Sequence, residues 1–93
     1  MDIKNNDKFL EAKLLFKLAR RRNWGASHTS FHNLTKGFKP KDQKQIKKIA
    51  EQLLKTGFLI KKPTSYGLEI SLNSNKSKQI KQKIKEMLGE YTK

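Results

Sequence analysis

The fold is decided by residues 39–72, which read KPKDQKQIKKIAEQLLKTGFLIKKPTSYGLEISL. From residue 46 onward, apolar residues recur at intervals of three and four, which is the spacing of one face of a helix. They are Ile46, Ile49, Ala50, Leu53 and Leu54. After Gly57 the apolar residues recur at every second position instead, as they do in half-buried strands. The stretch therefore predicts a helix over about 40–56 and two strands over about 58–62 and 68–72.

The ends of these elements are marked by proline and glycine. Pro40 suits the first position of the helix, while a capping box between Asp42 and Gln45 is an alternative start two residues later. Gly57 can adopt the left-handed conformation that ends a helix. Residues 61–67 contain a proline, a glycine and a polar tip, so we expect an outward-pointing loop between the strands.

The composition is strongly basic. Lysine and arginine number 22 against 8 aspartates and glutamates among 93 residues, which gives a formal net charge of +14. Such an imbalance favours a polyanionic partner, and nucleic acid is the leading candidate. The alternative is a lysine surface that only solvates the protein, although such surfaces usually carry comparable glutamate.

The same composition sets limits on other classes of protein. There is no cysteine, so neither a disulfide nor a cysteine-ligated zinc site is available. No apolar run approaches the roughly 18 residues of a membrane span, and the first residues do not resemble a signal peptide. We therefore expect one domain over residues 1–93, in the cytoplasm and without membrane contact.

The N-terminal third predicts two further helices. Apolar residues over about 7–22 cover more than one stripe, as in a central helix that is packed on two sides. Three arginines at 20–22 end this helix, and either complement its dipole or clamp phosphate. Thr29 or Ser30 could cap a short helix over about 30–36, and Gly37 would end it. The turn into the next helix then completes a helix-turn-helix.

Two histidines and the absence of catalytic motifs bear on chemistry. His28 and His32 are four residues apart, which on one helix would form a metal pair. Because no cysteine or nearby acidic residue supplies a third ligand, we expect them to face solvent or phosphate. No carboxylate pair, nucleophile motif or glycine-rich phosphate loop is present. We expect neither an enzyme nor a protein that carries a metal or cofactor.

A last helix is predicted over about 75–91. Its apolar residues are Ile80, Ile84, Met87, Leu88 and Tyr91. Their spacing is that of a short heptad seam, so this face either joins a homodimer or packs on the first helix of the same chain. Its other side is basic through Lys76, Lys78, Lys81, Lys83 and Lys85. Like charges at this spacing repel, which suggests an anion against them.

The order helix, short helix, long helix, strand, wing, strand, helix resembles that of winged-helix DNA-binding domains over about residues 7–91. The stretch LLKTGFLIKKPTSYGLEISLN is similar to the junction of recognition helix and wing in small stand-alone archaeal winged-helix regulators. The resemblance implies an α+β, mostly helical fold of three helices, a two-stranded β-hairpin wing and a C-terminal helix. It also implies a transcriptional regulator, with helix 40–56 in a major groove of double-stranded DNA and loop 61–67 on the backbone or minor groove.

The residues expected to contact nucleic acid form a basic arc over three segments. Gln43, Lys44, Lys47 and Lys48 lie on the long helix, where glutamine can bond adenine and lysine can read guanine or hold phosphate. The arc is completed by Thr29, Ser30, Lys36, Lys39, Lys41, Lys61, Lys62, Thr64, Ser65 and Tyr66. With roughly six phosphate contacts, log affinity should fall with log salt at a slope of about −5.

Two other functions use the same composition. A ribosome-associated or other RNA-binding winged-helix protein would place the same basic surface on folded RNA, and the spread of lysines over the long and last helices favours that alternative. A protein-interaction module would leave the excess positive charge unexplained.

Overall fold

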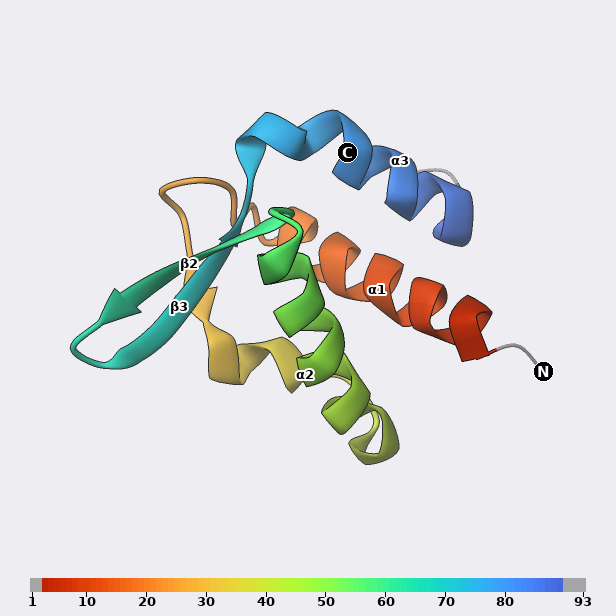
Figure 1. Cartoon of the computed structure of the whole chain (residues 1–93), viewed down its shortest axis with the longest axis horizontal. Coiled ribbons are helices and arrows are strands. Elements are labelled where there is room, and N and C mark those ends of the chain that lie inside the picture. Colours follow the sequence, from red (N-terminus) through yellow and green to blue (C-terminus); the bar gives the residue numbers. More distant parts are fainter. Residues whose placement is uncertain (1–2, 90–93) are drawn as a thin grey trace.

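The computed structural model describes residues 3–89 of the chain, and the side chains of residues 7–89. These residues form an α+β, mostly helical fold. The elements are α1 (Ile3–Arg20), β1 (Thr29–Ser30), the 3-10 helix η1 (Phe31–Thr35), α2 (Pro40–Lys55), β2 (Leu59–Thr64), β3 (Gly67–Leu72), the 3-10 helix η2 (Ser74–Lys76) and α3 (Ser77–Leu88). Figure 1 shows α1 between α2 and α3, with the β2–β3 hairpin projecting away from the helices.

The predicted central position of α1 is confirmed. Leu14, Leu15 and Leu18 are fully buried, and α1 contacts both α2 and α3. Ala12 and Ala19 are also buried, and their small side chains leave room for a neighbouring helix. The helix begins at residue 3 and ends at residue 20, so both ends lie earlier in the chain than expected.

The face of α3 that carries Ile80 and Ile84 packs into the core of its own chain. Ile80 and Ile84 are 0% and 1% exposed, and Lys83 Nζ lies 3.2 Å from Glu11 Oε1 on α1. Of the two expected arrangements, packing on the first helix is the one that Ile80 and Ile84 adopt within this chain. Tyr91 of the expected seam lies outside the described residues.

The sheet has one strand more than expected among the described residues. β1 pairs antiparallel with β3 in the register Thr29 with Ile70 and Ser30 with Glu69, giving the strand order β1-β3-β2. The expected two-stranded sheet is wrong in this respect, because a two-residue polar strand carries no alternation of apolar residues. Ser30 still caps the short helix, since its Oγ accepts a hydrogen bond of 3.0 Å from the backbone N–H of His32.

The start and end of α2 follow from local chemistry. Pro40 occupies the first turn of α2, and the capping box does not form because Asp42 already lies inside the helix. Gln45 donates a hydrogen bond to Asp7 of α1 instead. At the other end Gly57 has a φ of +86°, and the backbone N–H of Phe58 bonds the carbonyl of Leu53 at 3.0 Å. This is the Schellman motif, and it turns the chain directly into β2.

The wing is a regular hairpin with a shorter loop than expected. β2 and β3 pair from Leu59 opposite Leu72 to Thr64 opposite Gly67, which leaves two residues in the turn. Pro63 does not break the pairing, because β2 is an edge strand, where proline is tolerated. Thr64 Oγ1 accepts from the N–H of Tyr66 at 3.1 Å and donates to the carbonyl of Gly67 at 2.8 Å. These bonds fix the tip.

Candidate nucleic-acid interface

The outward face of α2 carries a row of lysines. We call Lys41, Lys44, Lys48 and Lys55 the lysine row. Their spacing of three, four and seven residues aligns them along one side of the helix, opposite the buried Ile46 and Leu53. All four side chains are exposed, and none forms an ion pair within the described residues 7–89. The like charges at spacings of three and four, Lys41 with Lys44 and Lys44 with Lys48, cost a few tenths of a kcal/mol each, which a bound polyanion would reverse.

Lys55 was not among the residues predicted from sequence to contact nucleic acid. Its spacing from Lys48 is two helical turns, so the period that identified the other lysines extends to it. The prediction stopped at the N-terminal half of the helix, where helix-turn-helix proteins contact base edges. The structure shows that the row of lysines continues to the C-terminal end of α2.

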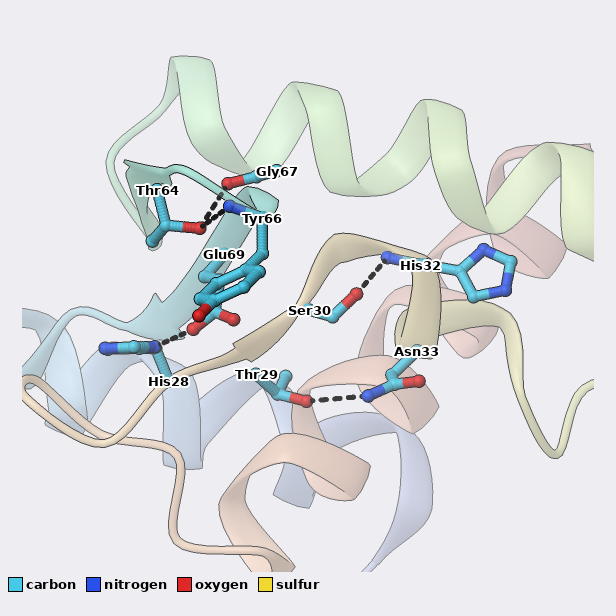
Figure 2. Close-up of polar contacts among 9 residues, drawn as sticks. All are labelled: His28, Thr29, Ser30, His32, Asn33, Thr64, Tyr66, Gly67 and Glu69. Carbon is cyan, nitrogen blue, oxygen red and sulfur yellow. Dashed lines mark hydrogen bonds and ion pairs between the residues drawn. The ribbon is translucent and has the colours of Figure 1, made fainter.

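Lys47 lies off the lysine row, on the side of α2 that faces the wing. It lines an open hollow of about 560 Å³ together with residues of η1 and of the hairpin tip. We call this the wing hollow, and its lining is Ser30, Phe31, His32, Lys47, Tyr66, Gly67, Leu68 and Glu69. Three segments that are distant in sequence are thereby brought to one concave surface, and Figure 2 shows Tyr66 and η1 on its two sides.

Several polar residues around the wing hollow are already engaged with one another. Thr29 Oγ1 accepts from Asn33 Nδ2 at 3.3 Å, and Ser30 caps η1 as described above. His28 Nδ1 forms a short contact with Glu69 Oε1 beside the Tyr66 ring (Figure 2). The hydroxyls of Ser30 and Thr64 therefore bond backbone groups beside the hollow, and that of Thr29 bonds the Asn33 side chain.

The structure places two predicted contact residues elsewhere. Gln43 Nε2 donates to the carbonyl of Phe38 at 3.1 Å, so this side chain holds the turn before α2. Lys36 lines a hollow together with Lys17 of α1 and Arg21 just after that helix, and its carbonyl accepts from the Lys17 ammonium. Sequence alone could not show the position of Lys36, because it depends on how η1 packs against α1.

The two wing lysines lie on opposite faces of the hairpin. Lys61 is opposite Ile70, which is buried, whereas Lys62 is opposite Glu69. Successive side chains of a strand point to opposite faces, so Lys61 and Lys62 cannot hold the same phosphate. Lys39, Lys41 and Ser65 are exposed at the start of α2 and at the hairpin tip.

The tip of the wing is expected to contribute to binding without contributing to stability. Tyr66 is 94% exposed and Lys62 is exposed, so Tyr66→Ala with Lys62→Ala removes little buried surface. We expect the melting temperature to change by less than about 3 °C, and the affinity for duplex DNA at 100 mM salt to fall about tenfold. Circular dichroism melting and fluorescence anisotropy measure the two quantities. Unchanged affinity would remove the wing from the interface.

The described residues show neither a metal site nor a membrane helix. His28 faces Glu69 ahead of β1 while His32 is exposed on η1, and no three metal-ligating side chains of residues 7–89 gather in one place. None of the helices within residues 3–89 is long and apolar enough to cross a membrane.

Comparison of the chain with protein-family models, curated proteins and solved structures gives no match. By its own fold and surface, the protein is a small α+β protein in which a long basic helix lies beside a projecting hairpin.

Proposed function

We propose that this protein binds double-stranded DNA in the manner of a winged-helix transcriptional regulator, with α2 in the major groove and the hairpin on the adjacent backbone. The observation that carries the proposal is the unpaired lysine row of α2 beside the wing hollow. A helix of 16 residues is about 24 Å long, and the major groove, about 12 Å wide, admits one helix.

The residues divide into two roles in this arrangement. The lysine row supplies phosphate contacts, which position the protein and provide most of the affinity. Lys41, Lys44 and Lys47 lie in the N-terminal half of α2, the part that reaches base edges in helix-turn-helix proteins. Gln43 would read a base only after releasing the Phe38 carbonyl. Binding is therefore expected to depend more on charge than on sequence.

An anisotropy titration of labelled random duplex DNA and of a structured RNA hairpin, at 50 and 200 mM salt, tests the proposal. With about six phosphate contacts, duplex affinity should fall roughly 1,000-fold between these salt concentrations. A clear preference for the RNA hairpin would replace the DNA proposal with the RNA-binding alternative. Failure to bind either probe at 50 mM salt would contradict both.

Lys47→Ala tests whether the wing hollow belongs to the interface. We expect about a fivefold loss of duplex affinity at 100 mM salt, because about 1 kcal/mol of phosphate attraction is removed. The slope of log affinity against log salt should become shallower by about 1. Lys85→Ala, an exposed lysine of α3, is the matched control and should have a smaller effect. Equal losses from the two variants would contradict a specific role of Lys47.

A further inference from the structure

A second basic surface lies on α1 and shares no residue with the wing hollow. One row about 16 Å long on this helix is formed by Phe9, Lys13, Phe16 and Arg20. Their spacing of four, three and four residues places them on one side of the helix. Lys13 Nζ lies 5.4 Å from the centre of the Phe9 ring, and Arg20 Cζ lies 5.7 Å from that of Phe16. Phe9 nevertheless remains 40% exposed. The row thus alternates aromatic rings with cations on the uncovered side of α1.

This row borders a trough with an apolar floor and basic sides. A hollow of about 540 Å³ is lined by Lys13, Phe16, Lys17, Arg20, Arg21 and Leu88. A second hollow of about 470 Å³ shares Lys13, Lys17 and Arg21 with the first, and extends to Lys36 and Phe38. We call the two together the α1 trough. It runs from the end of α3, across α1, to the turn after η1.

The charge of the α1 trough is uncompensated within the described part of the chain. Its five cations form no ion pair there, since the pairs among residues 7–89 are His28 with Glu69 and Lys83 with Glu11. Burial first, and then the neighbouring charges of Arg21 and Lys36, lower the pKa of Lys17. An anionic partner would relieve their mutual repulsion.

The apolar floor distinguishes between anionic partners. A phosphate backbone needs cations and gains little from Phe16 and Leu88, whereas a helix with both acidic and apolar residues uses the floor and the sides together. A second copy of this chain would bring like charges together, because each copy carries a formal +14. The length of the Phe9–Arg20 row matches three turns of a helix lying alongside it.

We propose that the α1 trough docks an acidic amphipathic helix of a partner protein, with carboxylates against Lys13, Arg20 and Arg21 and apolar side chains against Phe16 and Leu88. This inference does not rest on the proposed DNA binding, because it concerns a different face. A regulator with both faces would hold DNA on α2 and a protein partner on α1 at the same time.

A designed peptide is the probe. A fluorescein-labelled 16-residue peptide with leucine at positions i, i+4, i+7 and i+11, and mostly glutamate elsewhere, is titrated by anisotropy against the full chain. A peptide of the same composition with the leucines permuted off one face is the control. We expect the amphipathic peptide to bind at least tenfold more tightly. Equal binding of the two peptides, or binding of neither, would overturn the proposal.

Two double variants with the same net charge show where on the protein the peptide binds. Lys13→Glu with Arg20→Glu, and Lys44→Glu with Lys48→Glu, each lower the formal net charge by four. The first should weaken peptide binding at least tenfold and duplex binding by about tenfold or less. The second should weaken duplex binding about 1,000-fold and peptide binding by less than tenfold. Amide chemical shifts should change over residues 9–21 when the peptide is added. If a DNA duplex or an RNA hairpin perturbs those amides instead, the trough is a second nucleic-acid surface and the peptide proposal is wrong.

Discussion

Reversing the charges of Lys44 and Lys48 together is expected to reduce the affinity for duplex DNA about 1,000-fold at 100 mM salt. Each lysine within about 4 Å of a phosphate contributes about 1 kcal/mol in water, and a glutamate in its place adds a repulsion of similar size. Two reversals therefore cost about 4 kcal/mol, which is close to three powers of ten. Both side chains are exposed, Lys44 on the outer face of α2 and Lys48 beside Asp7 and Glu11 of α1, so the two substitutions remove little buried surface. Circular dichroism melting checks that the fold is retained.

Net charge alone would also reduce DNA binding, and a matched variant separates the two causes. Lys13→Glu with Arg20→Glu changes the formal charge by the same amount but on the α1 trough. We expect that variant to lose about tenfold or less, through the long-range part of the field. The comparison uses anisotropy titrations with one duplex over a range of salt. Similar losses from the two variants would show that α2 is not the DNA-binding helix.

The extent to which sequence predicted this molecule differs between its elements, for physical reasons. α2 and its end at Gly57 follow from local signals, because an apolar period of 3.6 and a left-handed glycine act within a few residues. β1 does not, because a two-residue strand exists only through its pairing with β3, about 40 residues away in sequence. Long-range pairing leaves no local pattern.

Of the two candidate surfaces, one could be predicted from sequence and the other could not. The exposed lysines of α2 were predicted, since the buried face of an amphipathic helix also identifies its outer face. The α1 trough was not, because α1 is apolar on two sides and its sequence does not show which arc its neighbours leave uncovered. The arginines at 20–22 were expected to complement the helix dipole or to clamp phosphate. Only the placement of η1 and α3 shows that Arg20 and Arg21 line a trough.

Among substitutions of single charged residues of α1, Lys17→Met is expected to lower the stability of the fold most. Lys17 Nζ donates to the carbonyls of Asn33 at 2.8 Å and Leu34 at 3.2 Å, and also to that of Lys36. These carbonyls lie at and just beyond the end of η1, and that of Asn33 also accepts a hydrogen bond of 3.2 Å from the backbone N–H of Lys36. Lys17 Nζ also lies 5.6 Å from the centre of the Phe38 ring. One ammonium thus fastens η1 and the following turn to α1.

The loss should be about 2 kcal/mol, or about 10 °C in melting temperature for a domain of this size. It is smaller than three charge-assisted hydrogen bonds would suggest, because burial and the charges of Arg21 and Lys36 oppose the ammonium and lower the pKa of Lys17. Lys13→Met is the control, because it removes an exposed charge from the same helix and breaks none of these carbonyl hydrogen bonds. It should change the melting temperature by less than about 3 °C.

The pH dependence of the Lys17→Met effect follows from the same pKa. Because the pKa of Lys17 is lowered below 10.5 in the folded protein, the folded state binds fewer protons than the unfolded state between the two values. The stability that Lys17 contributes should therefore rise with pH in that window. The difference in melting temperature between the natural chain and Lys17→Met should be larger at pH 10 than at pH 8. The other lysines are present in both proteins, so their titration cancels in this difference. A difference that shrinks would mean that the carbonyls hold the ammonium strongly enough to outweigh burial and repulsion.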